Sequence, residues 1–233
     1  VEKSLVMLDE RDEGSRYRML ETIREYAREK LDERGEDAAA TAARHCEHYF
    51  AFAKEAREGV KTAEQAKWIA RVETDLDNLR AATSLALAGG VDPFIAVKLA
   101  VAMQSFWLLR GYTTEGRNVV RAALALPAVQ ESDMAQAWAL YVGAALAYSQ
   151  SDHPDARRML ETCLELRRKL GNQVDVAATL STLALARLQG GDAAGALECE
   201  REALAIFRQL GDRIGEAISL LHLGQFNHWL GDD

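Results

Sequence analysis

Apolar residues recur at helical spacing along most of this chain, and the pattern repeats itself. Three segments align without gaps from Phe106, Leu146 and Ala186, so their starts are 40 residues apart, and a fourth copy begins at Phe226. Each unit holds two stretches whose apolar side chains are separated by three and four residues, which places them on one helix face. The pattern predicts a repeated helical hairpin.

The predicted helix ends fall at the same places in every unit. A residue that accepts a left-handed backbone closes a helix, and a short side chain with an oxygen atom follows and can cap the next one. The closing positions are Gly111, Ser151, Gly171, Gly191, Gly211 and Gly231. The capping positions are Asp152, Asn172, Asp192, Asp212 and Asp232.

Small residues recur where the two helices of a unit would approach closely. They are Ala144, Ala184 and Gly224 in first helices, then Gly116, Ala156, Ala196, Ala123, Cys163 and Ala203 in second helices. This phasing resembles the tetratricopeptide repeat, although the unit exceeds the usual length of about 34 residues and no proline closes it. HEAT and armadillo repeats have about this period, but the small residues favour the tetratricopeptide type. The predicted fold class is all-α, a right-handed α-solenoid of tetratricopeptide-like hairpins.

The first part of the chain does not follow this period. Residues 4–8 and 16–20 are strand-like and flank a polar stretch that contains Gly14, which predicts a β-hairpin with Gly14 in its turn. Residues 22–31 then place apolar side chains on one face of a helix. We therefore predict three parts: residues 1–36 as the end of a winged-helix module, 37–92 as a linking helical segment, and 93–233 as repeats with a truncated last unit.

Residues 2–6 (EKSLV) and 17–27 (YRMLETIREYA) resemble the end of the winged-helix module in bacterial signal-transduction ATPases of the STAND class, relatives of the NB-ARC proteins. Residues 68–87 and 106–120 are typical of the segment that joins this module to the repeats. The resemblance implies a protein that binds ATP through a P-loop and often regulates transcription. No Gly-Lys pair occurs in this chain, so a P-loop is excluded and no cofactor is expected. Without an initiator Met and ending after a turn signal, the sequence is expected to be a segment of a larger protein.

Charge and cysteine content limit the kinds of partner. The net charge is −8, and residues 1–36 carry 8 Lys and Arg against 11 Asp and Glu, so direct binding to nucleic acid is not expected. Three widely spaced cysteines give no disulfide framework, and we expect a cytoplasmic location. No apolar run is long enough to span a membrane.

Candidate catalytic and metal-binding residues are few. His45, Cys46 and His48 could offer ligands within one helical turn, but a structural zinc site needs four, so solvated histidines beside a packed Cys46 are favoured. Cys163 occupies a small-residue position and is predicted to be a core residue. A Cys-His catalytic pair is not excluded by spacing alone, yet no nucleophile motif supports one. The charged runs 160–169 and 200–209 are predicted to be solvated outer faces. No enzyme activity is expected.

The repeat phase also predicts a concave binding face lined by first helices. Aromatic side chains with polar neighbours are typical of sites that recognise proteins and peptides. Packing between neighbouring helices explains any single one of these residues equally well. The predicted face consists of Trp138, Tyr141, Tyr148, Leu185, Gln189, Gln225, His228 and Trp229.

Two functional hypotheses follow. In the first, the repeats are a sensor and scaffold that receives a protein, a peptide or a small inducer and signals to an ATPase. In the second, they regulate a fused cyclase or kinase. Because the last unit lacks its second helix, we also expect self-association through the apolar face of residues 213–230.

Overall fold

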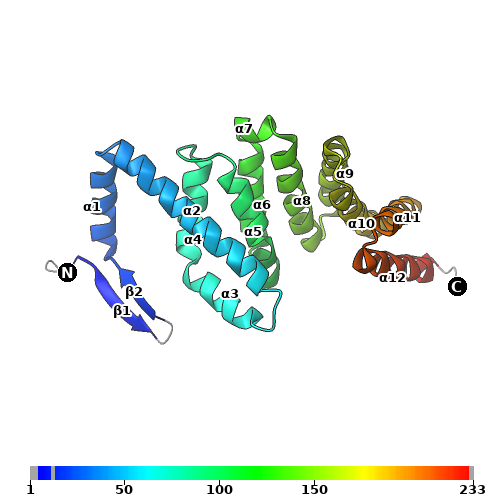
Figure 1. The fold of residues 1–233 in the computed structure, drawn as a ribbon, viewed down its shortest axis with the longest axis horizontal. Coiled ribbons are helices and arrows are strands. Elements are labelled where there is room, and N and C mark those ends of the chain that lie inside the picture. Colours follow the sequence, from blue (N-terminus) through cyan, green and yellow to red (C-terminus); the bar gives the residue numbers. More distant parts are fainter. Residues whose placement is uncertain (1–4, 12–13, 231–233) are drawn as a thin grey trace.

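The computed structural model describes residues 5–11 and 14–230 of the 233-residue chain. Its described part is a row of helices that begins beside a two-stranded antiparallel sheet and ends at α12 (Figure 1). The strands are β1 (Met7–Arg11) and β2 (Gly14–Arg18). The first helices are α1 (Glu21–Asp32), α2 (Glu36–Gly59), α3 (Gln65–Thr74) and α4 (Leu76–Leu87).

Helical hairpins make up the rest of the row, and the all-α repeat prediction is confirmed. The hairpins are α5 (Ile95–Arg110) with α6 (Thr113–Leu124), α8 (Asp133–Ser149) with α9 (His153–Leu170), and α10 (Gln173–Gln189) with α11 (Ala193–Leu210). A short helix, α7 (Pro127–Gln130), joins the first pair to the second. The row closes with α12 (Arg213–Leu230), which packs on α11.

The N-terminal hairpin is confirmed, but its strands are displaced from the predicted ones. Met7 pairs with Arg18 and Arg11 pairs with Gly14, so the ladder extends into the polar stretch. Gly14 therefore begins β2, and its predicted place in the turn is wrong. Backbone pairing needs no apolar side chain, which explains why the apolar runs misplaced the strands.

Helix ends agree closely with the predicted closing positions. The backbone is left-handed at Gly111, Gly171, Gly191 and Gly211, with φ between 69° and 84°, and at Ser151, with φ 60°. Ser151 is the one residue other than glycine with positive φ in the described ranges. Ser151 therefore adopts, at this repeat position, the left-handed conformation that glycine normally takes.

Replacing Ser151 with glycine is expected to raise the free energy of unfolding by about 0.5–1 kcal/mol, because the left-handed strain is removed at a smaller cost in chain entropy. Gly171 closes the next helix with φ 78° and has open space around it. The reverse change Gly171→Ser should lower stability by about 1 kcal/mol. Chemical denaturation of both variants checks this, and two changes of the same sign would contradict it.

The predicted caps are present wherever the structure describes them. Asp152 accepts the amide hydrogen of Asp155, Asp192 that of Gly195 and Asp212 that of Gly215, over 3.0 to 3.3 Å. Asn172 caps α10 in the same way through the amide of Asp175. The last predicted pair, Gly231 and Asp232, lies outside the described residues.

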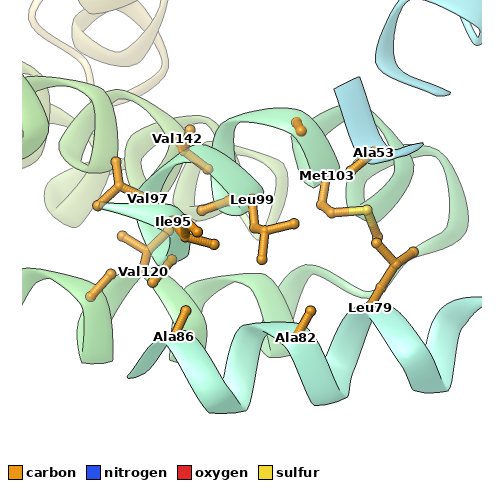
Figure 2. Packing of buried hydrophobic residues seen from close by; sticks show 14 of the residues in the cluster. Ala53, Leu79, Ala82, Ala86, Ile95, Val97, Leu99, Met103, Val120 and Val142 are labelled. Carbon is orange, nitrogen blue, oxygen red and sulfur yellow. The ribbon is translucent and has the colours of Figure 1, made fainter. Parts of the chain in front are cut away.

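One continuous core joins the segment 37–92 to the first repeats. Its buried residues come from α2 to α8, and Figure 2 shows how Ala53, Leu79, Leu99, Val120 and Val142 meet between these helices. The residues on the two sides of the predicted boundary at residue 92 thus share one hydrophobic core. The cavity described below has walls from both sides of this boundary, so the two parts position it together.

The predicted small residues are buried at the helix crossings, with one exception. Fully buried are Ala123, Ala144, Ala156, Cys163, Ala184, Ala196 and Ala203. Gly116 leaves no room for a side chain, because an added Cβ would lie 2.6 Å from the Trp107 ring. Gly224 on α12 is exposed with open space around it, so its predicted close approach is wrong. No described helix packs over that side of α12, so nothing there demands a small residue.

Candidate functional site

The eight residues of the predicted concave face lie on three first helices. Trp138, Tyr141 and Tyr148 belong to α8, Leu185 and Gln189 to α10, and Gln225, His228 and Trp229 to α12. The α8 residues and Leu185 are half-buried, whereas the α12 residues and Gln189 are exposed. The predicted face is therefore partly buried in the middle of the row and exposed to solvent at α12.

Two of these residues, Trp138 and Tyr141, share the wall of a cavity of about 520 Å³. The other walls come from α2, α5, α9 and α10, so the cavity lies where first helices of successive units meet. Tyr148 does not line this cavity. Its ring packs edge-on against His153 with 5.4 Å between ring centroids, and Leu185 packs against the buried core of the α8–α11 hairpins. The structure thus brings together part of the predicted face.

The α12 residues lie at the far end of the row from the N-terminal sheet (Figure 1). Trp229 is 67% exposed, and Ile214, Ile218 and Leu221 on the same helix are also exposed. An exposed set of large apolar side chains is uncommon on an isolated surface and is typical of a contact with another molecule. This surface is separate from the cavity.

Tyr141 is held in place by contacts on two sides. Its hydroxyl lies 3.1 Å from Thr182 Oγ1, which itself donates to the Ala178 carbonyl over 2.9 Å. The Tyr141 hydroxyl is therefore the donor in this pair. The guanidinium of Arg167 lies 4.4 Å from the centre of the Tyr141 ring, a cation–π contact. These contacts join α8, α9 and α10 at the cavity wall.

Arg167 is a functional candidate that the sequence interpretation missed. The run 160–169 was predicted to be a solvated face, but Arg167 is only 6% exposed, so this prediction is wrong here. Its Nη1 donates to the Asp175 carbonyl over 3.0 Å and to Thr179 Oγ1 over 2.8 Å. The signal was in the helix phase: Arg167 stands seven residues after Leu160 and four after Cys163, on their buried face.

Basic side chains dominate the cavity. Lys54 and Arg57 from α2, Lys98 from α5 and Arg167 from α9 line it, against one acidic lining residue, Asp175, among the described residues. The chain as a whole carries −8. A positive cavity in an acidic protein concentrates the potential at one place, where it attracts anions.

The possible metal ligands near the start of α2 do not form a site. Cys46 is fully buried and its Sγ donates to the Ala82 carbonyl over 3.4 Å, and burial raises the pKa of this thiol. Burial, and then the charge of His48, lower the pKa of His45. The half-buried His45 ring packs against Tyr49 with 4.7 Å between centroids, so the predicted solvated state holds for His48 and fails for His45. Within residues 5–11 and 14–230, no three His, Cys, Asp or Glu side chains are grouped as metal ligands.

The remaining cysteines are core residues. Cys163 is fully buried, as predicted, and its Sγ donates to the Ala137 carbonyl over 3.3 Å. Burial raises the pKa of both Cys163 and Cys199. A thiol is reactive as the thiolate, so these environments disfavour a nucleophile.

A second buried ionisable group lies between α10, α11 and α12. Glu200, in the run 200–209 that was predicted to be solvated, has 0% exposure, so that prediction is also wrong. It accepts from Ser181 Oγ over 2.8 Å, and its other oxygen lies 3.4 Å from His222 Nδ1. Like Arg167, it occupies an inward helical position, four residues after Ala196.

Comparison with known proteins identifies the type of helical repeat. Residues 133–209 match the tetratricopeptide repeat family model. They contain the α8/α9 and α10/α11 hairpins that the 40-residue period predicted. Residues 133–209 are thus similar to tetratricopeptide repeats, in agreement with the repeat type that the small residues predicted.

The relatives found by sequence are named as putative regulators. The chain is 30% identical over 227 residues to proteins named putative HTH-type transcriptional regulators, from Mycobacterium bovis and from Mycobacterium tuberculosis. The match covers 91% of this chain and 24% of each relative, so the chain spans about a quarter of their length. A solved STAND protein with a tetratricopeptide repeat sensor, from Pyrococcus horikoshii, matches 98% of this chain and 42% of its own, with a TM-score of 0.55 and 15% identity.

These matches confirm the predicted resemblance. The chain is similar in fold to part of a solved STAND protein and similar in sequence to proteins named putative transcriptional regulators. Among the described helices, none is both long and apolar enough to cross a membrane.

Proposed function

We propose that this chain is the non-catalytic sensor and scaffold region of a larger cytoplasmic STAND-type ATPase that regulates transcription. Its concave face binds a ligand or a protein partner, and the N-terminal hairpin with α1 passes that event to the ATPase. The names of the mycobacterial relatives favour control of transcription over the alternative of a fused cyclase or kinase.

The observation that carries this proposal is the cavity lined by α2, α5, α8, α9 and α10. Four first helices or their equivalents, α2, α5, α8 and α10, contribute to one cavity, so an occupant touches several units at once. In a solenoid each unit contacts only its neighbours, and small changes at each contact add along the row. A ligand held there can therefore alter the curvature of the array and bias a switch at its end.

The N-terminal hairpin and α1, which we propose pass the signal to the ATPase, carry exposed apolar side chains suited to contact with another domain. Leu8, Tyr17, Leu20 and Tyr26 are exposed on the hairpin and α1. A two-stranded hairpin is only marginally stable alone, so contact with a further domain would stabilise it. We propose that this surface packs against the winged-helix and nucleotide-binding part of the regulator.

The test is a transcription reporter controlled by the regulator that contains this chain. Trp138→Ala removes an aromatic wall of the cavity and should change reporter output severalfold. Lys67→Glu, an exposed change on α3, is the control and should leave output unchanged. Immunoblots confirm equal protein levels. Equal output from Trp138→Ala and the parent under inducing conditions would overturn the sensor proposal.

The chain alone is expected neither to bind nor to hydrolyse ATP. It has no Gly-Lys pair, and the backbone cradle and lysine of a P-loop are what hold the phosphates in this class of ATPase. Calorimetric titration with Mg-ATP should give only heats of dilution. Stoichiometric heat would contradict this expectation.

We further propose that the apolar face of α12 mediates self-association. A surface with Ile214, Ile218, Leu221 and Trp229 can meet a second copy of itself about a two-fold axis, since all its contacts are apolar and need no complementary partner. Sedimentation velocity should show a concentration-dependent dimer that Trp229→Glu abolishes. The matched control is Arg201→Glu on α11, an exposed change that should leave the dimer intact. A dimer indifferent to Trp229→Glu, or a monomer at high concentration, would contradict it.

A further inference from the structure

The cavity between α2, α5, α8, α9 and α10 has the size of a small-molecule site. Its volume is about 520 Å³, and cavities of about 300–1,000 Å³ enclose most small ligands. Lys54 on its wall is exposed, so the cavity reaches solvent. Val142, a buried residue of α8, also lines it, so the cavity extends down to the hydrophobic core.

The cations of the cavity are unequally compensated. Lys98 forms an ion pair with Asp92 over 2.9 Å, and Arg57 lies 3.7 Å from Glu58. Lys54 forms no ion pair within the residues that the structure describes. It is therefore one of two lining cations that form no ion pair with a carboxylate of residues 5–11 and 14–230.

Arg167 is the second and is the more informative, because it is buried. A buried charge is costly unless a partner compensates it. Its guanidinium is bound by a carbonyl, a hydroxyl and the face of Tyr141, all of them neutral groups. Its Nε has no hydrogen-bond partner in the described structure. The one acidic lining residue in the described part of the chain, Asp175, contacts Arg167 through its backbone carbonyl, and its carboxylate accepts from Asn172 Nδ2 over 2.8 Å. No described carboxylate is hydrogen-bonded to the buried guanidinium of Arg167.

Apolar surface completes the site. Phe50, Trp138 and Tyr141 line the same cavity, so an occupant meets rings as well as cations. Flat apolar surface favours a ring-bearing or otherwise apolar body. Because two of the four cations already have carboxylate partners, the remaining charge matches a single carboxylate better than a polyphosphate.

From this arrangement we infer that the cavity binds a small organic carboxylate whose apolar, ring-bearing body packs on Trp138 and Tyr141. The carboxylate supplies the counter-charge for Arg167 and Lys54. This inference rests on the proposed sensor function and names the chemical class of its ligand.

Three probes of one shape test it: 1-naphthoate, its neutral analogue 1-naphthamide and the cation 1-naphthylmethylamine. Calorimetric titration of this chain should give saturable binding of one naphthoate. Naphthamide should bind about tenfold more weakly, because it lacks the charge, and the amine should not bind measurably. Equal affinities for naphthoate and naphthamide would overturn the inference, as would no saturable naphthoate binding.

Matched variants locate the site. Lys54→Glu should weaken naphthoate binding about tenfold or more, whereas Lys67→Glu makes the same change in charge on α3, away from the cavity, and should not alter it. Both residues are exposed, and circular dichroism checks that both variants fold. Equal losses from the two would show a general charge effect and overturn the inference. An acetylated hexaglutamate peptide that binds more tightly than naphthoate would overturn it in favour of a peptide groove.

The two proposals fail separately. Naphthoate binding with an unresponsive reporter would leave the carboxylate site standing and reject the sensor function. A reporter that responds to Trp138→Ala, with no discrimination between naphthoate and naphthamide, would keep the sensor and reject the carboxylate.

Discussion

Ala196→Trp is expected to lower the free energy of unfolding by about 3 kcal/mol, because the larger side chain overpacks the crossing of α10 and α11. Ala196 has 0% exposure and belongs to the core cluster that also contains Ala184 and Leu180. Separation of these two helices would also weaken the interfaces with α9 and α12, since each unit stabilises its neighbours. Thermal and urea unfolding measure the effect.

The matched control is Ala205→Trp on the same helix. Ala205 is exposed, so the added ring projects into solvent and should cost only about 0.5 kcal/mol through helix propensity. If Ala196→Trp unfolded at the same temperature as Ala205→Trp, the assignment of Ala196 to a close helix crossing would be refuted.

Glu200→Ala should have an effect of similar size, about 2–4 kcal/mol. The change leaves a cavity where a fully buried side chain stood and removes the acceptor of Ser181 Oγ. It also removes the only carboxylate paired with His222 within the described residues. Three helices meet at this point, so the loss should be seen in the cooperative unfolding of the whole array.

Two residues along the same helix, Glu202 supplies the control. Its ion pair with Arg168 joins two half-exposed side chains, and such surface pairs contribute roughly 0–1 kcal/mol. Glu202→Ala should therefore change stability little in a urea titration. A loss from Glu200→Ala no larger than that from Glu202→Ala would mean that the buried pair contributes nothing to folding.

The repeat architecture was predictable because it depends on local rules. A residue such as Gly171 ends a helix through its own backbone freedom, and Asn172 begins the next through a side chain that reaches an amide three residues on. The same rules placed Ser151 at a left-handed position although it is not a glycine. Period, hairpins and caps all follow from such short-range interactions.

The candidate site was only partly predictable. The repeat phase grouped Trp138 and Tyr141, which line one cavity in the middle of the row, with Trp229, which lies on α12 at the end of the row (Figure 1). The position of a residue within the 40-residue repeat indicates which side of its helix it occupies. It does not indicate how successive units are oriented relative to one another. Lys54 and Arg57 come from α2, which lies outside the aligned repeats, so no repeat alignment could have included them. Lys98 stands 40 residues before Trp138, at the same repeat position, and the prediction missed it.

The sequence by itself determined that this chain is a helical solenoid with tetratricopeptide phasing, because helix periodicity, caps and small residues act within one or two turns. Only the tertiary structure decided which charged residues are buried. Arg167 and Glu200 belong to charged runs that look solvated, yet both are buried beside hydrogen-bond partners on the adjacent helix α10, Thr179 for Arg167 and Ser181 for Glu200. Burial of a charge depends on such a partner, and the partner is supplied by packing between helices.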